Sequence, residues 1–374
     1  MDFNKTEHQE MFQREVKKFT EAKLTPLVDI MDKQNEFPQE IRPKLAAMNL
    51  YGIPFDQKYG GAGADHVSLV LAMEEVAKVL APMAIHMQVG NVTCDRFNKL
   101  GTEKQKQEWM IPICEGEKLV CFAFTEPDTG SNPKMIKTRA TLDGDSYVVN
   151  GRKRFITNAP FADAAFIFAK DDDGDISLFL VEADRPGFST EKKMDKLGLR
   201  GTDLCDVVLE DVRIPTENLI GEKGGKFDAL KDAMTIGKMC LSAQCVGLMQ
   251  ASLEEAIKYS MNRMHFDEPI FELQAIHWLL AEMAARLEAS RWLVYRAAFL
   301  KDQGQDTIKD MAITKLFVTS TAPDVCRFGM QVHGAYGISK EYKIERLYRD
   351  AKMYELLEGT SEIQRELIVK RLPR

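Results

Sequence analysis

Apolar residues recur at helical spacing through the first third of the chain. Those between Phe12 and Leu24 fall near the intervals of one helix face. The segment 67–80 carries a broad apolar stripe on one face of a second helix. The glycine-rich stretch 59–64 predicts a loop, because no strand precedes it and no Lys-Ser/Thr pair follows it. We therefore expect residues 1–118 to form an N-terminal helical domain.

The pattern changes near residue 119. Short runs rich in β-branched and aromatic residues follow, separated by Asp-Gly and Pro-Gly turns. They predict strands at 119–124, 146–150, 164–169, 176–181 and 204–209. Because no helical pattern is interleaved with these strands, they indicate a central antiparallel β domain over 119–225 and argue against a Rossmann sheet.

Long helical patterns return after a glycine-rich linker that ends near residue 225. They cover about 226–262, 271–302, 307–335 and 359–371. Residues 226–374 are therefore expected to form a C-terminal four-helix bundle. The fold class that results is α+β, with helical, β and helical domains in that order.

Composition and charge narrow the classes of function. The 374 residues include 50 Lys+Arg and 57 Asp+Glu, and the net charge of −7 disfavours a nucleic-acid partner. No apolar run approaches the roughly 20 residues that a membrane span needs. Seven scattered cysteines and a charged, amphipathic N-terminus favour a cytoplasmic protein, although a chain whose presequence had been removed would look similar. The six histidines lack metal-ligand spacing, and no G-x-S-x-G motif is present.

One carboxylate near the C-terminus is a candidate general base. Glu358 follows two leucines that would desolvate it and precedes the flexible segment Gly359-Thr-Ser361. Desolvation raises a carboxyl pKa toward neutrality, which suits a base that removes a weakly acidic C–H proton. The alternative is a carboxylate that complements the dipole of the last helix. A second loop, Gln331 to Gly337, either admits a ligand close to its glycines or simply ends a helix.

Two longer motifs carry a resemblance to a known family. The first is Phe122-Ala-Phe-Thr-Glu-Pro-Asp-Thr-Gly-Ser-Asn132. The second begins Gln331-x-x-Gly334, continues to Asp350 and leads into Tyr354-Glu-Leu-Leu-Glu358-Gly-Thr-Ser. Shorter landmarks follow the same order at 155–158, 196–202 and 211–215. With these motifs the chain resembles the acyl-CoA dehydrogenase family from end to end.

The resemblance implies an FAD enzyme that acts on an acyl-CoA thioester. In this family a base removes the α proton while the β hydride passes to flavin N5, and electrons are exchanged with electron-transfer flavoprotein; the reverse reaction reduces an enoyl-CoA. Glu358 occupies the position of the family's commonest base. Other members place a glutamate where this chain has Gly237, which cannot serve. The family's usual assembly, a homotetramer, is also implied.

The resemblance further assigns residues to the two ligands. Around the flavin it places Phe122, Phe124, Thr125, Gly130, Ser131, Phe155 and Thr157, with Phe155 stacked near the isoalloxazine. Arg263 would meet the FAD pyrophosphate across a subunit boundary. The remaining FAD contacts would be Phe266, Gln274, Gln331, Gly334, Thr360 and Glu362. The substrate contacts would be Ser131, Asp95, Thr235, Lys238, Leu357 and Gly359.

Several residues depart from the family pattern. Thr129 and Asn132 stand where a small residue and an aspartate are usual, and Ala335 replaces a glycine. Thr235 and Lys238 stand where many members carry an aspartate and an arginine. Asp267 replaces a glycine and would put a negative charge near the FAD phosphates, which opposes their binding unless the side chain points away.

The acyl pocket is the least constrained part of the prediction. Its walls are expected from residues 89–97 and from the neighbourhood of Tyr354 and Leu357. Asp95 is either a second acid, able to act on a ring or to recognise a polar acyl group, or a solvent-facing helix residue. Three alternatives to the main hypothesis stay open: dehydrogenation of a cyclic acyl-CoA with altered regiochemistry, an oxidase that uses O₂, and a flavin-free protein that binds CoA esters.

Overall fold

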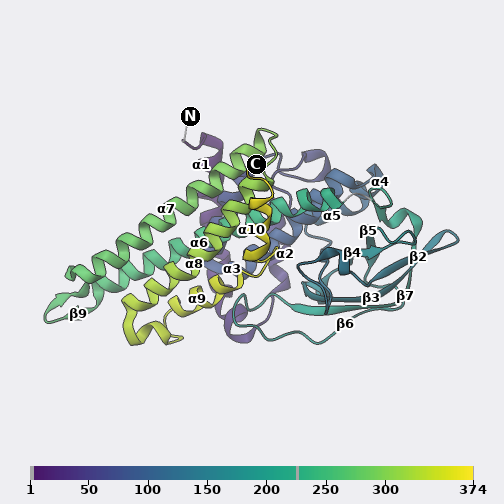
Figure 1. The fold of residues 1–374 in the computed structure, drawn as a ribbon. Coiled ribbons are helices and arrows are strands. Elements are labelled where there is room, and N and C mark those ends of the chain that lie inside the picture. Colours follow the sequence, from purple (N-terminus) through teal and green to yellow (C-terminus); the bar gives the residue numbers. More distant parts are fainter. Residues whose placement is uncertain (1–3, 225–226, 374) are drawn as a thin grey trace.

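The computed structural model describes residues 4–224 and 227–373, with side chains described except for 227–233. The molecule is elongated, with the strands of the large sheet in one half and most helices in the other (Figure 1). The N-terminal helices are α1 (Glu7–Phe19), α2 (Arg42–Ala47), α3 (His66–Leu100), α4 (Glu103–Gln105) and α5 (Ile111–Cys114).

Helix α3 is the central element of the helical half. Its N-cap residue is Asp65, whose side chain accepts a hydrogen bond from the backbone N–H of Ser68. Leu80 has non-helical backbone angles two residues before Pro82, so the helix bends there, as expected where a proline removes a backbone donor. Residues around most of the α3 circumference are buried. This explains why its sequence is apolar on more than one face.

The central domain contains a mixed sheet. Its strands are β1 (Val120–Ala123), β2 (Arg139–Asp143), β3 (Ser146–Thr157), β4 (Ala164–Lys170), β5 (Ile176–Glu182), β6 (Phe188–Thr190), β7 (Leu204–Pro215) and β8 (Leu219–Ile220). The order is β6-β7-β3-β2-β4-β5-β8, with β1 beside β4. The sheet encloses its own apolar core, which includes Tyr147, Val149 and Phe179.

The expectation of an antiparallel sheet holds for most pairings and is wrong for two. Strand β1 runs parallel to β4 with Val120 opposite Ala164, and β2 meets β4 in parallel at Arg139 and Lys170. Parallel neighbours need a long crossover connection, and the β2–β3 hairpin inserted between β1 and β4 provides it. The predicted strands correspond to β1, β3, β4, β5 and β7, whereas β2, β6 and β8 were not predicted.

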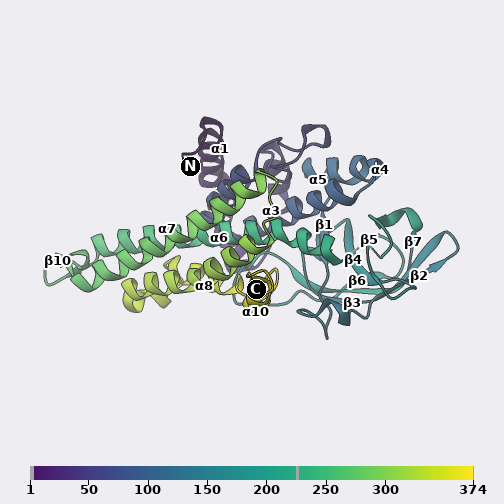
Figure 2. The same cartoon turned by 45° about the horizontal axis from the view of Figure 1, so that its top comes forward.

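The C-terminal helices run along the helical half of the molecule. They are α6 (Phe227–Asn262), α7 (Gln274–Asp302), α8 (Ile308–His333), α9 (Ile344–Met353) and α10 (Ser361–Val369). Helix α6 packs against α3, α7 and α8, and these helices lie side by side in both views (Figures 1 and 2). Between α6 and α7 a short hairpin, β9 (Met264–His265) and β10 (Glu268–Pro269), marks the end farthest from the sheet (Figure 1).

The three-domain α+β organisation predicted from the sequence is confirmed, and the long helical patterns correspond to α6, α7, α8 and α10. Helix α9 was not predicted. The boundaries near 118 and 225 stay a prediction, and the second of them falls outside the described residues. Within the described ranges, no helix is both long enough and apolar enough to cross a membrane. All seven cysteines are buried and unpaired by disulfides.

Candidate active site

Glu358 lies in the turn between α9 and α10 and directs its carboxylate at the backbone of α6. Its φ angle is 52°, and the next residue, Gly359, has φ 85°. A left-handed conformation costs a residue other than glycine about 1 kcal/mol or more, so the surrounding packing must hold Glu358 in place. A methyl group at Gly237 on α6 would lie 2.6 Å from Oε1 and 2.7 Å from Cδ of Glu358. The carboxylate therefore fits only because position 237 has no side chain.

Two side chains fix the turn that carries Glu358. The ammonium of Lys315 on α8 donates to the carbonyl of Gly359 at 2.7 Å and to that of Glu355 at 3.4 Å. The amide of Gln364 on α10 donates to the same Gly359 carbonyl at 2.8 Å. Lys315 is fully buried. A buried ammonium that binds backbone carbonyls ties the turn to the core of the helical domain.

Burial and nearby cations act on Glu358 in opposite directions. Burial raises the pKa of its carboxyl above the ordinary value, while Lys238, Lys315 and Arg96 oppose that rise. Burial lowers the pKa of Lys238 and of Lys315 to about 8, against the pull of the carboxylate. Gln88 on α3 also donates to Oε1 of Glu358 at 3.1 Å. The site can thus hold a carboxylate that is more basic than usual and still able to ionise.

The residues assigned to the flavin gather where β1 and β3 end. The backbone N–H of Arg154 donates to the carbonyl of Thr125 at 2.7 Å and joins the two strand ends. Phe155 has φ 61° and a side chain that is 52% exposed, with the Arg154 guanidinium 5.1 Å from its ring centre. Among the described residues, the hydroxyls of Thr125 and Thr157 have no hydrogen-bond partner. The exposed ring of Phe155 and the hydroxyls of Thr125 and Thr157 are therefore available to a ligand.

Further groups at this edge fit a planar ligand with polar atoms. A side chain at Gly130 would meet only Thr125, at 3.9 Å, so the backbone there borders open space. Oδ1 of Asn158 is buried and has no partner within the part of the chain that is described. Phe122 and Phe124 pack edge-on against Phe168 and form the apolar floor. This combination of apolar rings and available polar groups matches an isoalloxazine, which has an apolar body and polar edges.

Helix α3 joins this cradle to Glu358. His86 lies between Tyr51 and Asn158, with its Nε2 3.0 Å from the Tyr51 hydroxyl and its Nδ1 3.2 Å from Nδ2 of Asn158. Burial lowers the pKa of His86 to about 3, so its ring is neutral. Gln88, which reaches Glu358, lies only two residues further along α3. The predicted base and the flavin cradle therefore both contact one short stretch of α3, at Gln88 and at His86.

A buried ion pair shapes the loop of the first motif. Glu126 accepts hydrogen bonds from Lys153 at 2.8 Å, from the Thr138 hydroxyl at 2.5 Å and from the backbone N–H of Lys137 at 2.6 Å. Both members of the pair are almost completely buried. Lys153 also donates to the carbonyl of Phe124 at 3.2 Å. The motif's acid thus fixes the path of the chain beside the cradle.

A second group of predicted FAD residues lies at the other end of the chain's long axis. Arg263 precedes β9 and Phe266 lies in the turn between β9 and β10, far from the large sheet (Figure 1). The Arg263 guanidinium is 5.7 Å from the ring centre of Tyr336. Gly334 has φ 57° and open space where a side chain would be. The remaining members of this group are Gln274 at the start of α7 and Gln331 near the end of α8.

The hairpin turn explains the unusual Asp267. Phe266 and Asp267 both have positive φ, 47° and 66°, as in a two-residue type I′ turn. Glycine is favoured in such a turn, and aspartate is one of the few other residues that tolerate it. Asp267 is exposed. The backbone therefore accepts the substitution, and its consequence is electrostatic.

Three of the six predicted substrate residues, Asp95, Thr235 and Lys238, are buried. Thr235 and Lys238 on α6 are 1% and 4% exposed. The interpretation of Asp95 as a solvent-facing helix residue is wrong: it is 3% exposed and pairs with Arg96 and, at 3.2 Å, with Lys99. Its place on the inner face of kinked α3 explains why a charged residue there is buried. Leu357 and Gly359 flank Glu358 in the turn, while Ser131 is exposed in the loop after β1.

The two other predicted FAD contacts begin the last helix. Thr360 is the N-cap residue of α10 and makes no side-chain capping bond, and Glu362 pairs with Arg365 at 3.3 Å. Sequence reasoning missed Gln88 and Lys315 altogether. The only sequence signal for Lys315 is a charged residue within a mostly apolar stretch of helix. Gln88 lies in the predicted pocket helix but just before the segment 89–97 that was singled out.

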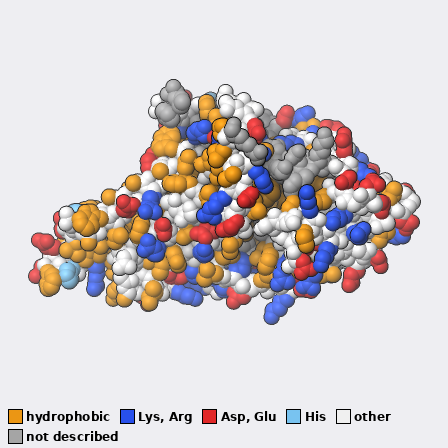
Figure 3. Space-filling model, viewed as in Figure 1, with side chains coloured by type: hydrophobic (Ala, Val, Ile, Leu, Met, Phe, Trp, Pro, Cys, Tyr) orange, Lys and Arg blue, Asp and Glu red, His pale blue; other side chains and the backbone are white. Residues whose placement is uncertain are grey.

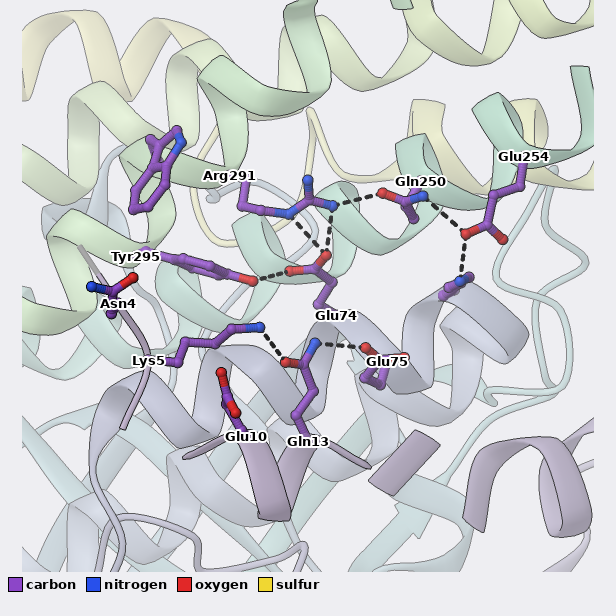
Figure 4. A pocket seen from close by; sticks show the side chains of 12 residues that line it. Asn4, Lys5, Glu10, Gln13, Glu74, Glu75, Gln250, Glu254, Arg291 and Tyr295 are labelled. Atoms are coloured by element: carbon purple, nitrogen blue, oxygen red, sulfur yellow. Dashed lines mark hydrogen bonds and ion pairs between the residues drawn. The ribbon is translucent and has the colours of Figure 1, made fainter. Parts of the chain in front are cut away.

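A separate polar hollow of about 480 Å³ lies beside the part of α3 that precedes its kink. Within it Glu74 accepts hydrogen bonds from Arg291 at 2.8 Å and from the Tyr295 hydroxyl at 2.7 Å (Figure 4). Arg291 also donates to Gln250 at 2.8 Å. These bonds join α3, α6 and α7, so the cluster accounts for itself as a structural network between helices.

Comparisons with known proteins cover the whole chain. The profile of the acyl-CoA dehydrogenase N-terminal domain matches residues 6–117, that of the middle domain 121–212 and that of the C-terminal domain 225–372. A short-chain specific acyl-CoA dehydrogenase of Clostridium acetobutylicum is 38% identical, with 98% of each chain covered. The caffeyl-CoA reductase-Etf complex subunit CarC of Acetobacterium woodii is 38% identical, with 97% of each covered.

The fold is similarly matched among solved structures. Butyryl-CoA dehydrogenase of Megasphaera elsdenii superposes with a TM-score of 0.97 at 36% identity, and the match covers 100% of both chains.

Proposed function

This chain belongs to the acyl-CoA dehydrogenase family, and on that premise we propose that it catalyses α,β-dehydrogenation of an acyl-CoA thioester, or the reverse reduction of an enoyl-CoA. In either direction Glu358 is the residue that takes or returns the proton on the carbon next to the thioester carbonyl. The enzyme class follows from the family, and the residue assignments are part of the proposal.

The contact between Glu358 and Gly237 carries the assignment of the base. The resemblance links both positions to the family's base, and here the carboxylate from one lies against the Cα of the other. Two sequence positions far apart along the chain therefore meet at one point in space. Burial raises the pKa of Glu358, as abstraction of a weakly acidic proton requires.

We propose FAD as the cofactor, held at the ends of β1 and β3. Thr125 and Thr157 would bind its polar edge, Phe155 would contact the ring, and Asn158 offers an unused acceptor. The chemistry that the cofactor supplies when bound is acceptance of a hydride from the substrate. Gln88 and the Gly359 turn would hold Glu358 in place for proton transfer at the carbon next to the thioester carbonyl. Electron exchange with electron-transfer flavoprotein is proposed because a 38% identical relative is named as a subunit of a reductase–Etf complex.

Separation of the two groups of predicted FAD residues supports an assembly of more than one copy, and we propose the homotetramer that the resemblance implies. Arg263 and Phe266 flank β9 at the end of the molecule opposite the sheet that carries the cradle (Figure 1). A second copy could supply them. That end also exposes apolar side chains, with Phe266 89% and Ile338 78% exposed, and Figure 3 shows hydrophobic side chains spread among charged ones over this half. Sedimentation velocity of the purified protein tests the assembly, and a monomer with tightly bound FAD contradicts it.

Anaerobic titration of the purified, FAD-loaded protein with a panel of acyl-CoAs tests the reaction. We expect at least one acyl-CoA to bleach the flavin absorbance, and Glu358→Gln to keep the yellow colour while abolishing bleaching. A colourless protein that takes up no FAD favours the flavin-free CoA-ester-binding alternative. Rapid reoxidation of the bleached enzyme by O₂ favours an oxidase, and bleaching only by cyclic acyl-CoAs favours altered regiochemistry. Bleaching retained in Glu358→Gln shows that the base lies elsewhere.

A further inference from the structure

A continuous chain of hydrogen bonds through the protein interior ends on the carboxylate of Glu358. The Tyr354 hydroxyl donates to Oε1 of Gln244 at 2.9 Å. Nε2 of Gln244 donates to Oε1 of Gln88 at 2.8 Å, and Nε2 of Gln88 donates to Oε1 of Glu358 at 3.1 Å. Tyr354 and Gln244 are fully buried, and Gln88 is 5% exposed. Its members come from α3, α6 and the segment after α9.

Two groups that can only accept, the ionised carboxylate of Glu358 and the backbone carbonyl of Ala84, fix the direction of these hydrogen bonds. An ionised carboxylate has no proton to donate, so the amide of Gln88 must turn its NH₂ toward Glu358. Its oxygen then needs a donor, which is Gln244. The NH₂ of Gln244 also donates to the backbone carbonyl of Ala84 at 3.3 Å, and this carbonyl cannot donate in return. The remaining oxygen of Gln244 is left for the Tyr354 hydroxyl.

We propose that Gln88 is a positioning residue for Glu358, and that Gln244 and Tyr354 hold its amide in the one orientation that donates to the carboxylate. This inference rests on the proposed function, because it assumes that Glu358 is the base. A donor held on the ionised form favours that form and keeps Oε1 against Gly237. These hydrogen bonds thereby offset part of the rise in the pKa of Glu358 that burial causes. A protonated Glu358 could still accept this bond through its carbonyl oxygen, but the bond would be weaker than the one to the ionised form.

Sequence motifs could not predict this hydrogen-bond chain, because its members are far apart in the sequence. Gln88 and Glu358 are 270 positions apart, and Gln244 and Tyr354 are 110 apart. Lys238, Lys315 and Arg96 also act on the same carboxylate. Unlike those three cations, Gln88 is neutral, so an apolar substitution there removes a hydrogen bond to Glu358 without removing a charge. Its effect on the pKa of Glu358 can therefore be separated from that of the cations.

The test compares the rate of anaerobic flavin reduction as a function of pH in wild type, Gln88→Leu and Tyr354→Phe. The substrate is whichever acyl-CoA bleaches the wild-type flavin. We expect the acid limb of the Gln88→Leu profile to move up by roughly one pH unit, since a hydrogen bond to a charged group is lost. The maximal rate should fall about tenfold or more with little change in KM, because the carboxylate loses its alignment. Tyr354→Phe should move the acid limb in the same direction by less.

Gln105→Leu is the matched control. Gln105 is also a buried glutamine, but its amide donates to the carbonyls of Glu217 and Leu219. It should lose stability and leave the acid limb in place. Tyr354→Phe removes one oxygen and serves where Gln88→Leu fails to fold.

The outcomes separate the two levels of the argument. Absence of bleaching in the wild type with every acyl-CoA refutes the proposed function. Bleaching in the wild type, with a Gln88→Leu acid limb that does not move, overturns the positioning role of Gln88. A shift in Gln88→Leu but none in Tyr354→Phe overturns the part assigned to Tyr354.

Discussion

Replacing Gly237 with alanine should separate stability from activity in this protein. The new methyl group would lie 2.6 Å from Oε1 and 2.7 Å from Cδ of Glu358, and ordinary van der Waals contact begins at 3.4 Å. The carboxylate would therefore have to move by about 0.8 Å. A misplacement near 1 Å can cost a catalytic group on the order of 100-fold in rate. Moving Oε1 also stretches its 3.1 Å bond to Gln88.

The same substitution should not harm the fold of α6. Gly237 lies inside a long helix and does not have a positive φ, so alanine is compatible with its backbone. Alanine stabilises a helix interior by roughly 1 kcal/mol relative to glycine. Since the clash is with the end of one side chain, we expect the free energy of unfolding to be unchanged or slightly increased. The substitution is therefore expected to slow flavin reduction without destabilising the fold.

Stopped-flow measurement of anaerobic flavin reduction and urea unfolding together test this prediction. A Gly237→Ala enzyme that reduces its flavin within about threefold of the wild-type rate would refute the placement of the carboxylate against α6. A thermodynamic cycle with Glu358→Ala supplies the control. Once the carboxylate is gone, Gly237→Ala should show the whole helix-propensity gain, and failure to do so would mean that the methyl group clashes with something else.

Three further predictions follow from charges and contacts near the site. Burial lowers the pKa of Lys238 to about 8, so its contribution to stability rises as the pH increases from 8 toward 10.5. In Lys238→Met, the free energy of unfolding measured with urea should therefore rise less over that pH range. The acid limb of its flavin-reduction profile should move to higher pH, because a cation that opposes the rise in the pKa of Glu358 is lost. Lys315→Met removes the ammonium that binds the Gly359 and Glu355 carbonyls. Flavin reduction should therefore slow about tenfold, and hydrogen exchange of the backbone amides in 356–360 should speed up. Unchanged exchange would contradict the anchoring role of Lys315. Asp267→Gly keeps the positive-φ turn and removes a negative charge, so FAD should bind this variant about two- to fivefold more tightly than the wild type at low salt in a fluorescence titration. Equal affinities of variant and wild type at both low and high salt would show that Asp267 faces away from the phosphates.

Elements with strong local signals were predictable and those without were not. The apolar pattern of α3, α6, α7 and α8 is long enough to indicate helices without tertiary information. Strands β6 and β8 are three and two residues long, too short for any alternation to be recognised. The parallel pairing of β1 with β4 depends on where the chain returns after the β2–β3 hairpin, which no single strand encodes.

The candidate site divides in the same way. Glu358 could be singled out because its neighbours along the chain, two leucines and a glycine, suggest burial and a turn. The expectation that both leucines desolvate it is wrong for Leu356, which is 61% exposed. Gln88 could not, because an isolated glutamine in an apolar helix is ambiguous until the partner on the other side is known. The burial of Asp95 with Arg96 has the same origin, because it depends on how α3 packs rather than on local sequence.

The groups that position the carboxylate of Glu358 and act on its pKa come from three other elements. Helix α6 contributes the bare backbone at Gly237 and the cation Lys238, α3 contributes Gln88, and α8 contributes Lys315. A net charge of −7 says nothing about a point where buried cations surround one carboxylate. Because α3 and α6 pack directly against each other, a shift between these helices would change the position and the pKa of Glu358 together. The packing that forms the apolar core is therefore the same packing that sets the chemistry of the site.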